Sequence, residues 1–317
     1  MKYQIAHQSL RGSRPTNQDR VAHAERDNAV LMVLADGLGG HRGGETAAEL
    51  LTQTVVRAFR TIRQPVIQQP SAFLALSILQ AHNAIYEYAK ATPELTPRTT
   101  CVLCLVQNGF AYWAHVGDSR LYHVRGGRLR VRTHDHTTTE ALRQEGLLSD
   151  EEMRDHPQKS RLLKCVGGPS RPTISLGEET RLEYGDLLLL CSDGLWEALP
   201  PEQLIAFLQR PSVEEAVDDM LAAAEKKMGA DSDNLSAVCL RWEEAATRAA
   251  PLQGNRAGEV DSNELWEHGA RVTAAQKGRP PKAPAAKAVK DIARDIRDLE
   301  DYVKSIDTRH KGKGTRK

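Results

Sequence analysis

The chain has 317 residues, of which 40% are apolar and 27% are charged, and its formal net charge at pH 7 is +1. This length predicts two domains, or one large domain with additional segments, and the apolar content suffices for a sizeable core. The balanced charge argues against nucleic acid as the main partner. No run of about 18 apolar residues occurs, so we expect no membrane-spanning segment and no membrane partner.

The first residues of the chain and its cysteines predict a cytoplasmic protein. Residues 1–5 lack the apolar stretch of a secretory signal peptide. The five cysteines lie inside apolar stretches, which is typical of reduced core thiols. Cys101 and Cys104 form a lone CxxC motif, but positions i and i+3 of a strand face opposite sides. We therefore interpret both as structural residues.

Residues 1–242 alternate strand-like and helix-like patterns. Hairpin signals at Asn108-Gly109 and Gly126-Gly127 separate consecutive strand-like segments, which predicts an antiparallel meander. The helical segments come in adjacent pairs, which argues against a doubly wound parallel sheet. The predicted strands are 3–8, 29–35, 101–107, 110–116, 120–124, 186–191 and 235–241, and the predicted helices are 44–62, 72–91, 200–208 and 213–227.

The polar segment between residues 137 and 172 is too long for a simple turn. We interpret it as a mobile flap that contains a short helix, because loops of this length in compact domains are often functional.

The composition changes after residue 242. Residues 243–287 are rich in Ala, Pro and Lys and predict a flexible linker. Residues 288–308 carry apolar side chains at alternating spacings of three and four, which predicts a short amphipathic helix with a heptad pattern. This helix could dock on the core, or it could mediate dimerisation or partner docking. Residues 309–317 form a basic tail.

Three aspartates lie at the ends of apolar strand-like runs. Asp36 and Asp193 follow such runs, and Asp233 precedes one. A carboxylate at such an edge is unfavourable unless a cation pairs with it, and oxygen ligands suit hard divalent ions. If the three converge, they could hold two ions together with the carbonyl of Gly37, with Asp36 bridging them.

Arg14 offers a planar fork that suits a phosphate dianion. The implied reaction is attack of a metal-bound hydroxide on phosphorus, without a covalent phospho-enzyme. The absence of a CxxxxxR motif favours this over a cysteine-based phosphatase.

Six short motifs, in order, resemble the bacterial branch of the metal-dependent protein phosphatase 2C family, and the resemblance covers about residues 3–242. Any one of them is unspecific, whereas six in order are highly specific. They are Arg14-Pro15-Thr16-Asn17-Gln18-Asp19, Ala35-Asp36-Gly37-Leu38-Gly39-Gly40-His41 with Gly44-Glu45, Gly117-Asp118-Ser119-Arg120, Asp135-His136-Thr137, Ser192-Asp193-Gly194-Leu195-Trp196 and Asp233-Asn234-Leu235-Ser236.

The resemblance implies an α+β fold, a four-layer α-β-β-α sandwich of two antiparallel sheets flanked by helices, as a catalytic domain over residues 1–242. It implies hydrolysis of phosphoserine and phosphothreonine in proteins with Mn²⁺ or Mg²⁺, two ions tightly bound and a third, weaker one. Residues 139–170 would be the variable flap beside the active site. The implied roles are metal ligand for Asp36, Gly37, Asp193, Asp233 and, at the weaker ion, Asp118; phosphate binding for Arg14; and orientation of metal-bound water for Asp19.

Some roles stay open in the sequence. Where many eukaryotic members carry a His proposed as general acid, this chain has Leu38, so His41 is either that acid or a structural loop residue. Gln18 replaces a common Glu, which puts the water network in doubt. Asp118 could instead only shape its turn, and Arg120 could pair with a core acid.

Two histidines and three tryptophans have structural interpretations. His134 and His136 lack further ligands for zinc at a useful spacing, and we expect His136 to hydrogen-bond to the backbone near the flap. Trp113, Trp196 and Trp242 are interpreted as core residues.

The expected partners are phosphorylated proteins, among them a Hanks-type Ser/Thr kinase and its substrates. Two other functions remain: a pseudophosphatase that binds phosphoproteins without hydrolysis, and a scaffold whose tail matters more than its catalysis. The first predicts loss of a primary metal ligand, and no such residue is lost here. Deletion of residues 243–317 would test the second.

Overall fold

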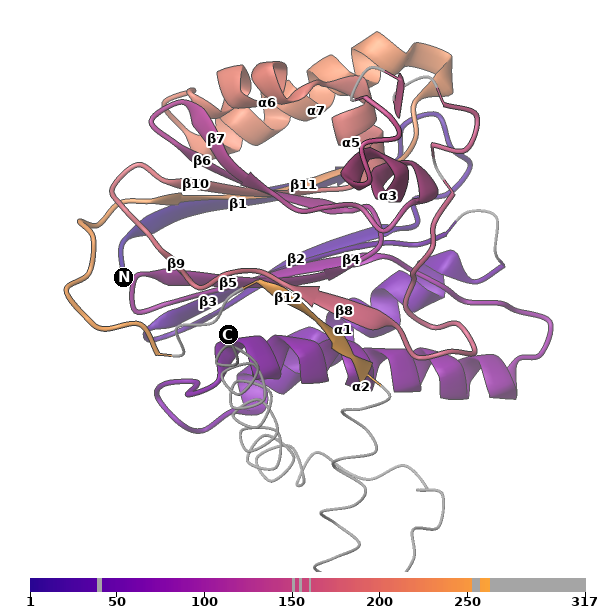
Figure 1. The fold of residues 1–317 in the computed structure, drawn as a ribbon, viewed down its shortest axis with the longest axis horizontal. Coiled ribbons are helices and arrows are strands. Elements are labelled where there is room, and N and C mark those ends of the chain that lie inside the picture. Colours follow the sequence, from indigo (N-terminus) through magenta and orange to yellow (C-terminus); the bar gives the residue numbers. More distant parts are fainter. Residues whose placement is uncertain (39–41, 150–151, 154–155, 160, 253–256, 263–317) are drawn as a thin grey trace, which may run out of the picture.

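The computed structural model describes residues 1–38, 42–149, 152–153, 156–159, 161–252 and 257–262. Two antiparallel sheets stack face to face, and helices cover the outer face of each (Figure 1). This arrangement confirms the predicted α+β sandwich of four layers. It also confirms the argument from paired helices, since every strand pair in both sheets is antiparallel.

The first sheet joins the two ends of residues 1–242. Its strand order is β1-β11-β10-β6-β7, so the N-terminal strand pairs along its whole length with the strand formed by residues 235–242. The bounds are β1 Tyr3–Leu10, β6 Arg120–Arg125, β7 Arg128–Arg132, β10 Leu187–Cys191 and β11 Leu235–Trp242.

The second sheet has the order β12-β8-β5-β4-β3-β2, and β9 also pairs with β5. Strand β12, Gly258–Asp261, lies inside the segment that was predicted as a linker over residues 243–287. The linker prediction is wrong for these four residues, because pairing with β8 orders this short polar segment as the edge of the sheet. The bounds are β2 Asp19–Arg26, β3 Ala29–Asp36, β4 Cys101–Gln107, β5 Phe110–Val116, β8 Thr173–Leu176, β9 Thr180–Arg181 and β12 Gly258–Asp261.

The helices divide between the two outer faces. α1 and α2 cover the second sheet, whereas α5, α6 and α7 cover the first, and α3 lies at one end of the sandwich, in the predicted flap (Figure 1). The bounds are α1 Gly44–Thr61, α2 Pro70–Ala91, α3 Thr138–Gln144, α5 Asp193–Ala198, α6 Pro201–Leu208 and α7 Val213–Met228, followed by a 3-10 turn at Gly229–Asp231.

Three apolar clusters fill the spaces between the four layers. One lies under α1 and α2, one lies under α5 to α7, and the third lies between the sheets. Cys101 belongs to the first cluster and Cys104 to the third, so the two thiols face opposite sides of β4. This confirms that the CxxC motif is structural.

The inter-sheet layer contains fully buried side chains whose truncation should lower stability. Leu190 of β10 is fully buried between Leu121 and Val238 on the neighbouring strands. We expect Leu190→Ala to lower the free energy of unfolding by about 2–5 kcal/mol, because it leaves a cavity that close packing cannot refill. Urea unfolding measures this loss. Leu129→Ala, at a 38% exposed position on β7, is the control, and an equal loss in both variants would contradict the expectation.

Several predictions fall on parts that the structure does not describe. His41 is one of them, as are the amphipathic helix over 288–308 and the basic tail over 309–317, so these stay predictions. The domain boundary at residue 242 also stays a prediction. No described helix combines the length and the apolar character that crossing a bilayer requires.

Candidate active site

Two of the predicted site aspartates face each other across one strand ladder. Asp19 begins β2 and Asp36 ends β3, and the antiparallel register makes them direct partners. The end of β3 is held by its neighbours, since the carbonyl of Asp36 accepts hydrogen bonds from Thr100 N and Thr99 Oγ1, both at 2.8 Å. The ladder therefore places two carboxylates side by side at one end of the second sheet.

The remaining carboxylates come from the same end of the first sheet. Asp193 is the first residue of α5, directly after β10, and Asp233 lies just before β11. The two strands are joined there by Ser192, whose Oγ accepts a hydrogen bond from Ser236 N at 3.0 Å. Asp118 lies in the loop before β6, which pairs with β10.

The pKa shifts show that these carboxylates share one environment. Burial raises the pKa of Asp36 well above its ordinary value, and the negative charges of Asp193, Asp19, Asp118 and Asp233 raise it further, in that order. Burial raises the pKa of Asp193 in the same way, and Asp118 and Asp233 add to it. Carboxylates from both sheets therefore lie within electrostatic reach of one another.

The pKa values of Asp19 and Asp118 are also raised, by smaller amounts. Burial raises the pKa of Asp19 to about 6, although contacts with Ser236 and Ser192 act against it. Burial raises the pKa of Asp118 to about 7, and the charge of Asp135 adds to this. The Oδ2 atom of Asp19 is buried without a hydrogen-bond partner, so nothing on the described chain satisfies it.

This donor set fits hard divalent cations. All five side chains present carboxylate oxygens, which Mn²⁺ and Mg²⁺ prefer. The burial that raises the pKa of Asp19, Asp36, Asp118 and Asp193 is unfavourable for their charged forms unless positive charge pairs with them. Among the described residues, no three Asp, Glu, His or Cys side chains stand close enough together to hold one ion. The fit therefore rests on donor type, on burial and on the orphaned oxygen of Asp19.

The raised pKa of Asp118 predicts that ionisation of this carboxyl lowers the stability of the metal-free protein. Between about pH 4 and pH 7 the folded chain keeps a proton that the unfolded chain has released, so this group's contribution to stability falls as the pH rises. We expect Asp118→Asn to unfold with a free energy higher by on the order of 2–4 kcal/mol at pH 8 and nearly unchanged at pH 4.

The difference is measured by urea unfolding in chelator at several pH values. Excess Mn²⁺ should remove the advantage of the variant. A difference that stays constant from pH 4 to pH 8 would show that the Asp118 carboxyl is not perturbed by folding.

Arg14 and Asp233 lie together, although the sequence assigned them to phosphate and to metal. Arg14 Nη2 donates to Asp233 Oδ2 at 2.7 Å, and both side chains are substantially exposed. Exposed ion pairs are weak because solvent screens them. The guanidinium therefore stands at the carboxylate cluster, where a phosphate or a cation can compete for either partner.

Asn234 is a site residue for which no role was predicted from the sequence. Its Oδ1 accepts from Gln18 N at 2.9 Å, and its Nδ2 donates to the carbonyls of Arg11 and Thr16 at 2.8 and 3.0 Å. One amide therefore holds the loop that carries Arg14. In the sequence, the only signal for this role was the position of Asn234 directly after Asp233.

The glycine after Asp36 is required by a close approach of two chain segments. A Cβ atom on Gly37 would lie 2.4 Å from the carbonyl oxygen of Gly44 and 2.8 Å from that of Gln18. No other residue fits there without displacing the start of α1. The role of the Gly37 carbonyl as a metal ligand stays a prediction.

The structural interpretation of two other residues is confirmed. Arg120 forms a bidentate ion pair with buried Asp135, at 2.8 and 2.6 Å. His136 Nδ1 accepts from Gly117 N at 3.1 Å, which is the expected backbone hydrogen bond.

Trp196 differs from its prediction as a simple core residue. It is only partly buried, its ring lies 3.5 Å from the Arg120 guanidinium carbon, and its Nε1 donates to the carbonyl of Asp118 at 2.9 Å. Trp113 and Trp242 are buried, as predicted.

Comparison with known proteins agrees with this geometry. The sequence profile of the family described as "Protein phosphatase 2C" matches residues 8–238, which is well over half of the chain. The chain belongs to this family.

Several relatives of this protein phosphatase 2C chain are similar along most of their length. A "Putative protein phosphatase 2C-type" of Streptococcus pyogenes serotype M6 is 28% identical over 227 residues, which cover 71% of this chain and 92% of the relative. The solved serine/threonine phosphatase of S. agalactiae is 28% identical with a TM-score of 0.71, over 76% of this chain and 100% of that one. The catalytic domain of the serine threonine protein phosphatase PstP, solved in complex with two manganese ions, is 29% identical with a TM-score of 0.66, over 76% and 99%.

Proposed function

We propose that this chain is a metal-dependent protein-serine/threonine phosphatase. The observation that carries the proposal is the group of buried carboxylates from both sheets, which raise one another's pKa at one end of the sandwich. Family membership and relatives named serine/threonine phosphatase support it. In this proposal the substrate is a phosphoserine or phosphothreonine side chain of a protein.

The cofactor in this proposal is Mn²⁺ or Mg²⁺, with two ions bound tightly and a third more weakly. The manganese-bound PstP domain supports a manganese site in this chain. Asp36, Gly37, Asp193 and Asp233 would hold the tight pair, and Asp118 would hold the weaker ion. When bound, such a pair lowers the pKa of a water molecule and offsets the charge of the phosphoryl group.

The protein's own groups bind and orient the substrate. Arg14 stands beside Asp233 with an exposed guanidinium, so it can take the phosphate oxygens in a planar fork. Asp19 has a buried, unpartnered carboxylate oxygen that can accept a hydrogen bond from a water at the site and orient it. His41 would be the proton donor to the leaving serine or threonine oxygen.

The proposed partners are phosphorylated proteins, including a Ser/Thr kinase of the Hanks type and the substrates of that kinase, in the cytoplasm. The segment over residues 288–308 would serve dimerisation or partner docking. A pull-down with Asp193→Asn from cells that contain such a kinase tests the partner proposal. Recovery of no phosphoprotein would count against it.

The function is tested with the purified full chain on p-nitrophenyl phosphate, a phosphothreonine peptide and a matched phosphotyrosine peptide, with and without Mn²⁺. We expect manganese-dependent turnover of the first two substrates and preference for the phosphothreonine peptide over the phosphotyrosine peptide. Adding excess chelator should abolish turnover, and adding back Mn²⁺ should restore it. A folded chain that binds Mn²⁺ and turns over none of the three would refute the proposal.

A further inference from the structure

Glu140 of α3 is a fully buried carboxylate with three cationic or potentially cationic neighbours. Its oxygens accept from Arg143 at 2.7 Å and from Arg132 at 3.2 Å, and they contact His134 Nδ1 at 2.7 Å. Burial alone would raise its pKa, but these partners outweigh burial and lower it to about 2. The carboxylate therefore stays charged and holds its neighbours in place.

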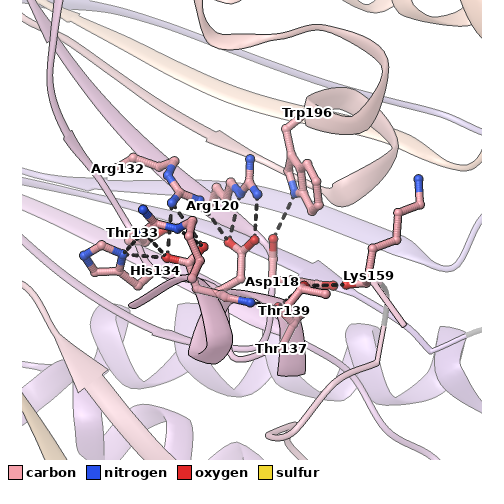
Figure 2. Close-up of polar contacts among 12 residues, drawn as sticks. Asp118, Arg120, Arg132, Thr133, His134, Thr137, Thr139, Lys159 and Trp196 are labelled. Carbon is pink, nitrogen blue, oxygen red and sulfur yellow. Dashed lines mark hydrogen bonds and ion pairs between the residues drawn. The ribbon is translucent and has the colours of Figure 1, made fainter. Parts of the chain in front are cut away.

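A continuous series of contacts leads from Glu140 to the Asp118 loop, and Figure 2 labels Arg132, Arg120, Trp196 and Asp118 along it. Arg132 lies between Glu140 and Asp135, 3.2 Å from the first carboxylate and 3.7 Å from the second. Both carboxylate oxygens of Asp135 accept hydrogen bonds from Arg120, and the Arg120 guanidinium stacks on the ring of Trp196.

The series ends on the main chain of Asp118. Trp196 Nε1 donates to the Asp118 carbonyl at 2.9 Å, which holds the backbone from which this carboxylate projects (Figure 2). His136 holds the preceding residue by accepting from Gly117 N. Two neighbouring side chains of one segment, Asp135 and His136, therefore secure the loop before β6 from both sides.

The same segment holds α3. The Thr137 side chain caps the helix by accepting from Glu140 N, and Thr138 N donates to the carbonyl of Arg161 at 3.1 Å. Buried ion pairs stabilise a fold less than apolar packing of similar volume, so anchoring a seven-residue helix does not by itself call for this network. Polar groups behind metal ligands, in contrast, set the orientation of those ligands and tune metal affinity.

We propose that Glu140 is a positioning residue for Asp118, acting through Arg132, Asp135, Arg120 and Trp196. Loss of the charge at Glu140 frees Arg132, loosens the Asp135–Arg120 pair and releases the Trp196 hydrogen bond to the Asp118 backbone. The result is weaker binding of the ion held by Asp118. This inference rests on the proposed function, because it takes Asp118 as a metal ligand.

The test measures Mn²⁺ binding to the full-length protein by isothermal titration calorimetry, a method that needs no turnover. Asp118→Asn first identifies which binding event belongs to Asp118. Glu140→Gln should then weaken that event by up to roughly 10-fold, the lower end of the effect of altering a group that bonds a metal ligand directly, and leave the tighter events unchanged. Glu145→Gln makes the same chemical change at an exposed position just after α3 and should bind Mn²⁺ like the wild type.

Trp196→Phe keeps an aromatic ring beside Arg120 but removes the N–H donor at the other end of the series, and it should weaken the same event. Because both changes act on one series, Glu140→Gln combined with Trp196→Phe should weaken it by less than the product of the two single effects. If the double variant weakens Mn²⁺ binding by the full product of the two single effects, the two residues act independently and the proposal is overturned. Wild-type Mn²⁺ binding by Glu140→Gln together with a lowered melting temperature would also overturn it, because that result assigns Glu140 to stability alone.

Arg132→Lys serves if Glu140→Gln does not fold, since it keeps the positive charge and removes the fork between the two carboxylates. It should weaken the Asp118 event in the same way, and unchanged binding would overturn the proposal. Failure of the proposed function is recognised separately, because it appears as absence of phosphatase turnover in the wild-type chain.

Discussion

Asp36→Asn should abolish turnover and at the same time stabilise the metal-free protein. Changes behind metal ligands already lower activity by 10- to 100-fold, so loss of Asp36, the proposed bridging ligand, should lower kcat/KM by at least about 100-fold. The same change removes a buried charge that burial and four neighbouring carboxylates disfavour. An acid whose pKa is raised by folding destabilises the folded state above its ordinary pKa, so the metal-free variant should be more stable than the wild-type protein at pH 8.

Steady-state kinetics with Mn²⁺ and urea unfolding in chelator measure the two effects. Asp27→Asn makes the same change in the exposed turn at the other end of the β2–β3 hairpin and should alter neither. A variant that loses activity and stability together would indicate damage to the fold instead of removal of a ligand. A variant that keeps activity would show that Asp36 is not a ligand.

Asp135→Ala should have the largest effect on stability. Arg120 is buried, and Asp135 holds its guanidinium with two charge-assisted hydrogen bonds. Removing the carboxylate leaves an uncompensated buried charge, because a guanidinium cannot release its proton in a protein. Breaking such a pair costs about 3–5 kcal/mol, and we expect a loss of that size in the free energy of unfolding.

Chemical denaturation at pH 7 measures this loss. Glu87→Ala breaks the exposed pair between Glu87 and Lys90 on α2 and should have little measurable effect. Replacing both buried partners, as Arg120→Met with Asp135→Leu, should recover part of the lost stability, since no charge is then left unpaired. If the double variant is as unstable as Asp135→Ala, packing around Trp196 causes the loss, not the unpaired charge.

Local patterns predicted the elements whose interactions are mostly local. The apolar run before Asp36 gave β3, and the hairpin signal at Asn108-Gly109 gave the β4–β5 pair. β2 was missed, because Asp19–Arg26 carries charged residues at both ends and its partner β3 determines its conformation. β12 was missed for the same reason, since only pairing with β8 distinguishes Gly258–Asp261 from the rest of the predicted linker.

By itself, the sequence predicted which residues carry the chemistry. Aspartates at strand ends, the glycine after Asp36 and an arginine near the N-terminus are visible in the chain, because each is recognised from a few adjacent residues. Only the tertiary structure decided how they meet. Arg14 pairs with Asp233 across 219 positions of sequence, and strand pairing in two different sheets brings the carboxylates of Asp36 and Asp193 within reach of one another. The physical reason is that pKa shifts and ion pairs depend on distance in space and on burial, which only the packed sheets create.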